Sequence, residues 1–446
     1  MQKNDIYTVT IDGMTDDGSG VGRVDGLAVF VPYTLVGETV SIKILKTQKR
    51  YAFAKTLDIL TPSPMRIEPE CPHFYRCGGC RFFHCTYEEE LKYKQQQVHD
   101  ALARIGNIDA PVEPIIGAPN TLHYRNKAQF PVSESGIGFY SQRSHNIVDI
   151  DRCIIQNAAC DAIVRCVRDW MQRYDIAPYN ESRHSGSIRH IYTRTAAGTG
   201  KVLVCIVTRD ENIKHSELLV ESLLELDINI IGVVQNINPN PTNIILGGKN
   251  RILHGRDYIF DSIGDLTYKI SMYSFFQVNS AQTRVLYDTA RDALALKGGE
   301  TVWDLYSGIG TIGMHMARSA GKVIGVEIVP DAVRDARENA KLNDIDNAVF
   351  YEGSAENVAP MLLKDGHKPD VIIVDPPRKG CDTSLLNTIA KANPEKVLYI
   401  SCKPSTLARD LAVLKDMGYA VQYVQPVDMF PHTHHVENVV KLARRQ

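Results

Sequence analysis

"DLYSGIGTIG", residues 304–313, is the stretch that decides the fold of the carboxyl-terminal half of the chain. It follows the apolar segment "TVW" and contains the spacing G-x-G-x-x-G at Gly308, Gly310 and Gly313. A strand that turns through glycines into a helix brings backbone N–H groups close to a bound nucleotide. Glu327 ends the next apolar segment, where a carboxylate can accept hydrogen bonds from ribose hydroxyls. The stretch therefore predicts a nucleotide-binding strand–turn–helix unit.

Strand-like and helix-like segments alternate around this turn, from about residue 265 to the end of the chain. The segments "GKVIGVEI" (321–328), "DVIIVDPP" (370–377) and "KVLYISC" (396–402) lack the polar alternation of a half-exposed strand. Strands that helices cover on both faces have this composition. We predict a doubly wound, Rossmann-like domain over residues 263–446, with its ligands at the carboxyl ends of the strands.

The residues at the end of the "DVIIV" strand help to decide between two candidate cofactors, a dinucleotide and S-adenosylmethionine. In "IIVDPPRKG" (372–380), Asp375 precedes two prolines, which form a stiff turn and hold polar groups over the crevice. A dehydrogenase needs no such turn, whereas an enzyme that positions a flat base beside a methyl donor would use one. The sequence therefore favours S-adenosylmethionine.

"YISCKPSTLARDL" (399–411) places Cys402 at the end of the next strand, where we expect it beside Asp375. A thiolate that adds to carbon 6 of uracil makes carbon 5 nucleophilic enough to take a methyl group. Such a thiol should be partly exposed, with its pKa lowered from about 8.5. We expect Lys403 and the N-terminus of the following helix to lower it. Cys381, beyond the proline turn, is the rival nucleophile.

A candidate base lies in "DMFPHTHHVENVV" (428–440), on what reads as a loop entering a final strand. A buried Glu437 near a target base would have a raised pKa suited to proton transfer. The histidines before it lack an evident fourth ligand, so we do not predict a metal site there. Phe275 and Phe276 are candidates either for stacking on a base or for core packing.

The amino-terminal half has a different composition. Residues 1–60 contain β-branched alternation with frequent turn signals, which predicts a small β-barrel. The basic and aromatic stretch 41–55 suits either RNA phosphates and bases or a solvated strand edge. Residues 61–262 open with the proline-rich segment 61–72 and a predicted helix over 86–105. The remainder of this central region reads as α+β, with a topology that the pattern does not give.

Composition limits the alternatives. With 446 residues, a net charge of −2 and 44% hydrophobic residues, the chain reads as a multidomain globular protein. It has neither a bilayer-spanning apolar run nor an apolar signal core at its start, so we expect a cytoplasmic protein and no membrane contact. Cys71, Cys77 and Cys80 are spaced to bind zinc or, with a distant fourth cysteine, an iron–sulfur cluster.

Together "DLYSGIG", "DPPRKG", "SCKPSTLARDL" and "FPHTHHVE" resemble the class I, S-adenosylmethionine-dependent RNA (uracil-5-)methyltransferases, and the resemblance spans nearly the whole chain. Residues 1–60 look like a TRAM domain, an OB-like RNA-binding barrel at the start of such proteins. The resemblance implies a monomeric enzyme that makes 5-methyluridine in 23S ribosomal RNA. A transfer RNA methyltransferase is the close alternative, and a non-catalytic RNA-binding protein with the same fold is the distant one.

The resemblance also implies roles for individual residues. It makes Cys402 the nucleophile and Glu437 the general base, and it places Cys153 as the fourth ligand of a 4Fe–4S cluster with Cys71, Cys77 and Cys80. The remaining implied positions contact the methyl donor or the target base: Gln277, Tyr306, Gly308, Gly310, Glu327 and Asp375. Lys403 stands where the family often has Asn.

Overall fold

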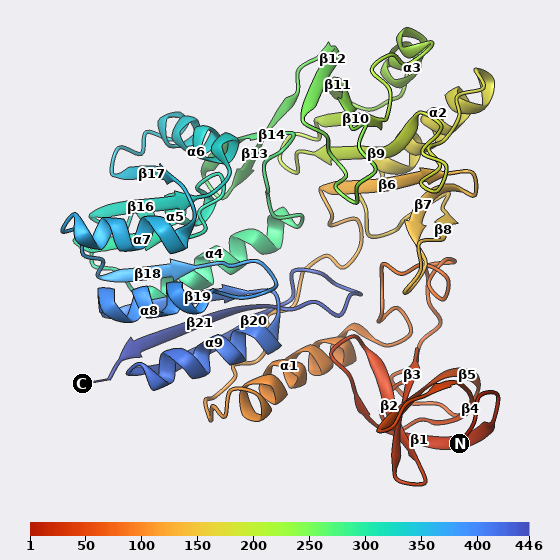
Figure 1. Cartoon of the computed structure of the whole chain (residues 1–446), viewed down its shortest axis with the longest axis horizontal. Coiled ribbons are helices and arrows are strands. Elements are labelled where there is room, and N and C mark those ends of the chain that lie inside the picture. The colour runs from red at the N-terminus through yellow and green to blue at the C-terminus, as the bar shows by residue number, and fades with distance from the viewer. Residues whose placement is uncertain (446) are drawn as a thin grey trace.

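The computed structural model describes residues 1–445, and its amino-terminal part is a five-stranded closed barrel (Figure 1). The strands close in the order β1-β2-β3-β5-β4, with β3 and β5 parallel. Alternate residues such as Val29, Val31 and Val40 are buried inside it, as the two-residue period predicts. The predicted barrel is confirmed. Its strands are β1 (Ile6–Met14), β2 (Ser19–Val24), β3 (Leu27–Pro32), β4 (Thr39–Thr47) and β5 (Tyr51–Thr61).

A long connection with three of the clustered cysteines leads from the barrel to helix α1 (Tyr87–Arg104), close to the predicted 86–105. Three glutamates in the first turn and Arg104 in the last suit the helix dipole. The helix buries Val98 and Leu102 in one hydrophobic core with the carboxyl-terminal sheet. It lies beside α9 in Figure 1, so it belongs spatially to the carboxyl-terminal domain.

The central region contains a seven-stranded mixed sheet in the order β12-β11-β10-β9-β6-β7-β8, with two helices packed against it. Its α+β character is as predicted, but β12 carries mostly exposed side chains and was not expected. The elements are β6 (Lys127–Ser133), β7 (Gly136–Tyr140), β8 (Ile147–Asp149), α2 (Ala159–Arg173), β9 (Ile188–Thr195), β10 (Val202–Thr208), α3 (Ser216–Leu224), β11 (Ile230–Ile237) and β12 (Lys249–Gly255).

A two-stranded hairpin, β13 (Tyr258–Ile263) and β14 (Leu266–Ser271), connects the central sheet to the last domain. The boundary predicted between residues 262 and 263 falls within β13. The hairpin packs into one hydrophobic core with residues of the central sheet and of the carboxyl-terminal domain. The two regions are therefore joined by shared packing.

The carboxyl-terminal domain is the predicted doubly wound fold: a seven-stranded sheet in the order β17-β16-β15-β18-β19-β21-β20. The first five strands of that order are parallel, and β21 runs antiparallel to both of its neighbours. Helices α4, α5 and α6 pack on one face, and α7, α8 and α9 on the other. The elements are α4 (Ser280–Leu294), β15 (Thr301–Asp304), α5 (Thr311–Ala317), β16 (Lys322–Glu327), α6 (Pro330–Leu342), β17 (Ala348–Glu352), α7 (Ala355–Lys364), β18 (Val371–Val374), α8 (Thr383–Ala392), β19 (Lys396–Ser401), α9 (Pro404–Asp416), β20 (Tyr419–Val427) and β21 (Glu437–Arg444).

Among the helices of residues 1–445, none is both long enough and apolar enough to cross a membrane.

Candidate active site

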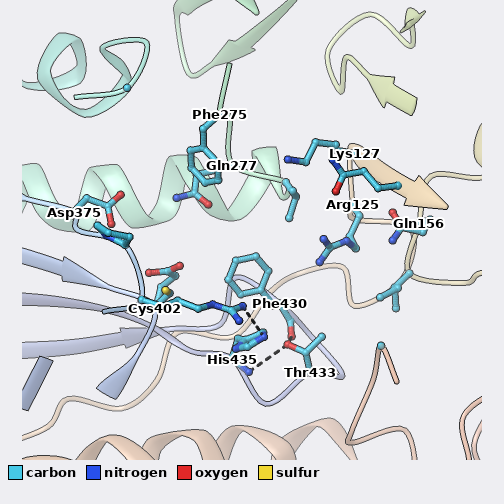
Figure 2. Close-up of a pocket in the computed structure, with 18 of the residues that line it drawn as sticks. Arg125, Lys127, Gln156, Phe275, Gln277, Asp375, Cys402, Phe430, Thr433 and His435 are labelled. Carbon is cyan, nitrogen blue, oxygen red and sulfur yellow. Dashed lines mark hydrogen bonds between the residues drawn. The ribbon is translucent and has the colours of Figure 1, made fainter. Parts of the chain in front are cut away.

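A cavity of about 940 Å³ lies where the carboxyl ends of β15, β18 and β19 face the start of β6 and the clustered cysteines. This volume is in the range of pockets that hold a ligand of nucleotide size. Figure 2 shows Asp375 and Cys402 on one side of it, Arg125 and Lys127 on the other, and Phe275 between them. The cavity therefore joins the predicted cofactor crevice to the central domain.

The glycine-rich turn forms one wall through its backbone. Gly308 and Gly310 have positive φ values of 54° and 84°, and a Cβ on Gly310 would come within 2.6 Å of Met314 Cε. Glu327 accepts the Gly308 N–H at 3.0 Å and thereby fixes the turn. Gly308 and Glu327 line the cavity, whereas Gly310 is turned toward the core and contributes only its conformation.

Two carboxylates lie close to this turn, the buried Asp304 and the half-buried Asp375, which lines the cavity. Asp304 accepts the Gly313 N–H at 2.9 Å, and burial raises its pKa to about 7. Burial together with the nearby Asp304 raises the pKa of Asp375 to about 7 as well. Tyr306, also on the cavity wall, donates its hydroxyl hydrogen bond to Glu356 at 3.3 Å.

Cys402 follows β19 and is half-buried in the cavity, opposite the first residue of β21, Glu437. The pairing of β19 with β21 produces this juxtaposition, because Ser401 lies opposite Asn438. Glu437 is buried with one carboxylate oxygen lacking a hydrogen-bond partner. Burial and the proximity of Asp375 raise its pKa well above the usual range.

The predicted lowering of the thiol pKa is wrong for the ligand-free protein. Burial, then Glu437 and Asp375, raise the pKa of Cys402 to about 11, while Arg378 opposes them. Lys403 is exposed and is the N-cap residue of α9, so its charge is directed to solvent. The neighbours that control this thiol come from other strands.

The rival cysteine lies elsewhere. Cys381 is buried in the core behind the sheet, outside the cavity lining, and burial raises its pKa to about 12. Asp410 accepts its backbone N–H at 2.7 Å. Of the two thiols, Cys402 alone faces the cavity.

The two adjacent phenylalanines separate into the two roles that the sequence left open. The side chain of Phe275 is 61% exposed and lines the cavity, whereas Phe276 is 2% exposed and belongs to the core. Gln277 lines the cavity as predicted, and its backbone carbonyl accepts a hydrogen bond from the side chain of Asn126 at 2.9 Å. An exposed ring beside an amide suits a flat, hydrogen-bonding base.

The loop from β20 to β21, residues 428–436, is held by a buried ion network. Lys94 on α1 donates to Glu90 at 2.6 Å, to Asp428 at 2.7 Å and to the carbonyl of Phe430 at 3.1 Å. Glu90 also accepts the backbone N–H of His432 at 2.7 Å. The network therefore fixes the loop that leads into Glu437.

The histidines of this loop are packed or hydrogen-bonded. The ring of His432 stacks on Phe83 with centroids 3.8 Å apart, and burial lowers its pKa to about 3. Arg378 donates to His435 at 3.0 Å, an interaction drawn in Figure 2. Arg378 thus lies between the thiol and the loop.

The four cysteines implied as cluster ligands meet at the far end of the same cavity. Cys71, Cys77, Cys80 and Cys153 all line it, and the other three sulfurs contribute to raising the pKa of Cys80. Within the described residues, no three His, Cys, Asp or Glu side chains are arranged to hold a single metal ion. Of the cysteines outside this group and the two candidate nucleophiles, Cys85, Cys160 and Cys205 are buried and Cys166 is half-buried.

Several residues that line the cavity were not predicted from the sequence; they lie near the start of β6, after β8, after β18 and in the loop between β20 and β21. "YRNKAQ" (124–129) reads as an ordinary strand start, and only its two cations hinted at a site. The missed residues are Arg125, Lys127, Gln129, Arg152, Gln156, Arg378, Phe430 and Thr433.

Comparison with known proteins shows the family to which this chain belongs. The sequence profile of the tRNA (uracil-5-)-methyltransferase family matches residues 86–445, and that of the TRAM domain matches residues 2–57. An uncharacterized RNA methyltransferase of Halalkalibacterium halodurans is 47% identical over 99% of this chain and 98% of its own length. One from Clostridium tetani is 44% identical over 99% and 97%.

A solved structure covers nearly the same length. The tRNA (uracil-54, C5)-methyltransferase of Pyrococcus abyssi, in complex with S-adenosyl-L-homocysteine, superposes with a TM-score of 0.81 at 26% identity. The match covers 98% of this chain and 100% of the archaeal one. The chain therefore belongs to the tRNA (uracil-5-)-methyltransferase family, S-adenosylmethionine-dependent enzymes that act on RNA, and begins with a TRAM domain.

Proposed function

We propose that this enzyme methylates carbon 5 of a uridine in 23S ribosomal RNA, with Cys402 as nucleophile and Glu437 as general base. One observation carries the proposal: a thiol, the buried carboxylate of Glu437 and the half-buried carboxylate of Asp375 face one cavity beside an exposed aromatic ring, Phe275. Uracil needs this set of groups, because its carbon 5 becomes nucleophilic only after a thiolate adds to carbon 6.

The residues act in sequence. Cys402, as thiolate, forms a bond to carbon 6 and pushes an electron pair into the ring, so that carbon 5 can attack a methyl group. S-adenosylmethionine, when bound, supplies that methyl group. Glu437 then takes the proton from carbon 5, and the sulfur leaves carbon 6 with restoration of the ring. The raised pKa of Glu437 makes its carboxylate a stronger base for this step.

The remaining predicted residues divide between donor and target. Tyr306, Gly308 and Glu327 line the cavity at the ends of β15 and β16, where the donor's adenosine and ribose would lie. Gln277 lies beside Phe275, where it would hydrogen-bond the target base. Asp375 lies next to Cys402 on the cavity wall and would hold the base against the methyl donor.

The four clustered cysteines fit a 4Fe–4S cluster. Backbone N–H groups point at three of the sulfurs: His73 at Cys71, Gly79 at Cys77, and Ile155 with Gln156 at Cys153. N–H groups directed at sulfur stabilise thiolates, the form in which cysteine binds iron. The ligands of a four-iron cluster bind different iron atoms and stand farther apart than the ligands of one ion. Iron and sulfide analysis of anaerobically purified protein, with Cys80→Ser as the variant, tests this assignment.

The RNA class is assigned by the resemblance of the TRAM barrel and the cysteine spacing. Because the archaeal tRNA enzyme spans the same length, the assay must compare both RNAs. Tritiated methyl donor is supplied with 23S ribosomal RNA or with transfer RNA, each from cells that lack the gene. We expect 5-methyluridine in the ribosomal RNA only. Label confined to transfer RNA would reassign the substrate, and label on neither RNA would refute the proposal.

The nucleophile is tested with RNA that contains 5-fluorouridine, whose carbon 5 cannot lose a proton, so the covalent adduct persists. Peptide mapping should find the adduct at Cys402, and Cys402→Ser should abolish it. Cys381→Ser is the matched control and should retain it. We also infer from the family resemblance that the enzyme acts as a monomer; light scattering of the purified protein tests this.

A further inference from the structure

The wall of the cavity opposite Cys402 carries two cations on the strand β6 and the residues just before it. Arg125 and Lys127 both line the cavity, and Figure 2 shows the Lys127 ammonium directed toward Phe275 and the Arg125 guanidinium below it, on the side of Phe430. The Lys127 ammonium is 5.9 Å from the centre of the Phe275 ring. The carboxylates of the cavity thus lie at its cofactor end, together with Arg378 and Lys379, whereas Arg125 and Lys127 lie at the opposite end.

These cations have no carboxylate partner. Among the ion pairs of residues 1–445, none includes Arg125, Lys127 or Arg194, the buried arginine paired with Lys127 across β6 and β9. Arg194 is hydrogen-bonded to Tyr192 and to a backbone carbonyl, and one of its terminal nitrogens has no partner. Burial and the two arginines lower the pKa of Lys127 to about 8. Charges concentrated without a counter-ion in a half-buried wall are costly unless an anion binds there.

The wall is rigidly attached to the segment that presents Phe275. The backbone N–H of Asn126 donates to Val278 at 2.7 Å, and its side chain donates to the carbonyl of Gln277 at 2.9 Å. When the Gln156 amide is oriented with its oxygen toward Arg125, it accepts from Arg125 Nε at 3.2 Å and donates to the carbonyl of Lys127 at 3.2 Å. Arg125 therefore keeps its outer nitrogens for a ligand, at a fixed position relative to the aromatic ring.

We propose that Arg125 and Lys127 form a phosphodiester-binding site, which holds the backbone phosphate next to the target nucleotide when its base lies against Phe275. The inference rests on the proposed function, because the anion is the RNA backbone itself. A nucleotide turned out of a stack carries its phosphate with it, and an arginine and a lysine are the residues that bind phosphate oxygens most strongly. The site would make the enzyme require a nucleotide within a chain, because a free base offers no anion.

This assignment differs from a structural role in its effect on stability. A cation that serves only the substrate is tolerated by the folded protein at a cost, so replacing it should not destabilise the fold. Lys127→Met, which keeps the length of the side chain, should leave the melting temperature unchanged or raise it. A lysine that supports the fold would give the opposite result.

The decisive test combines a substitution in the protein with a change in the RNA backbone and measures the rate of adduct formation for each combination. The RNA is a fragment bearing 5-fluorouridine at the mapped target, with either natural phosphates or a single uncharged methylphosphonate 5′ or 3′ of that nucleotide. For wild-type protein, one of the two methylphosphonates should slow the adduct about 10- to 100-fold, the range for a charge-assisted contact. Lys127→Met should show a similar loss on natural RNA and little further loss on that modified RNA.

Lys46→Gln, on an exposed part of the TRAM barrel, is the matched control. It should weaken binding equally on all three RNAs, so its effects should simply add to those of the methylphosphonates. Additive effects for Lys127→Met at both positions would overturn the phosphate site and indicate instead that the lysine acts on the base. Absence of any adduct with wild-type protein and natural RNA would contradict the proposed function rather than this inference.

Discussion

The reactivity of Cys402 in the ligand-free enzyme can be calculated from its surroundings. Burial and two carboxylates raise its pKa from 9.0 to about 11. At pH 8 this shift leaves about 100-fold less thiolate than in an unperturbed cysteine. The more basic thiolate is intrinsically about eightfold more nucleophilic toward a disulfide, which partly offsets the loss. We therefore expect Cys402 to react roughly tenfold more slowly than a free thiol at pH 8.

The assay measures the rate at which an aromatic disulfide modifies Cys402. Peptide mass spectrometry detects the modified residue at pH values from about 7 to about 12, a range that brackets the expected pKa. A synthetic peptide of residues 399–405 supplies the unperturbed rate. The rate for the protein should rise with pH until about pH 11. A plateau below pH 9, the usual pKa of a thiol, would refute the electrostatic reasoning.

Variants separate the causes of the shift. Glu437→Gln removes a negative charge beside the sulfur and should lower the apparent pKa of Cys402 by about one unit, whereas Arg378→Gln should raise it. Glu356→Gln, on the same cavity wall but not among the groups that shift this thiol, is the matched control and should leave the profile unchanged. Equal profiles for Glu437→Gln and the wild type would show that the charge of Glu437 does not contribute to the raised pKa of Cys402.

Three further predictions concern the framework of the site. Lys94→Met leaves two buried carboxylates without their cation and should lower the free energy of unfolding in urea by about 3–5 kcal/mol. Adding Asp428→Asn to this variant should recover part of that stability. A further loss of stability in the double variant would contradict the ion network. Gly310→Ala forces a Cβ against the core at positive φ and should lower the melting temperature measurably, whereas an unchanged value would mean that the turn adapts. Phe276→Ala should cost about 3–5 kcal/mol of stability, while Phe275→Ala should keep the stability and lose adduct formation; the reverse pattern would exchange their roles.

Local patterns predicted most of the fold. Helix α1 was expected over 86–105 and spans Tyr87–Arg104, because its acidic first turn and its apolar spacing are local signals. The uninterrupted apolar strands of the carboxyl-terminal sheet were predicted for the same reason. Strand β12 was missed because it is an edge strand with mostly exposed side chains, which leave no periodicity to read.

The part of the site that is made of strand ends within one domain follows most directly from the sequence pattern. Asp375 and Cys402 meet because neighbouring parallel strands end at the same edge of the sheet, and the antiparallel strand β21 begins there with Glu437. The sign of the Cys402 pKa shift was mispredicted because Lys403, its neighbour in sequence, is exposed to solvent. Lys127 reaches the cavity from a strand of another domain, and no local signal encodes that approach.

The distribution of the hydrophobic cores determines which truncations of this protein are informative. The TRAM barrel has a core of its own, but its Leu35 packs with Phe82 and Cys85 and its Glu38 pairs with Arg66, so removing residues 1–60 would leave those groups without their partners. The other regions share their cores, since the central sheet and α1 both pack into those of the catalytic sheet. A fragment that begins at residue 263 would lack those packing partners and expose apolar surface. Its inactivity would report on misfolding rather than on the loss of a separate module.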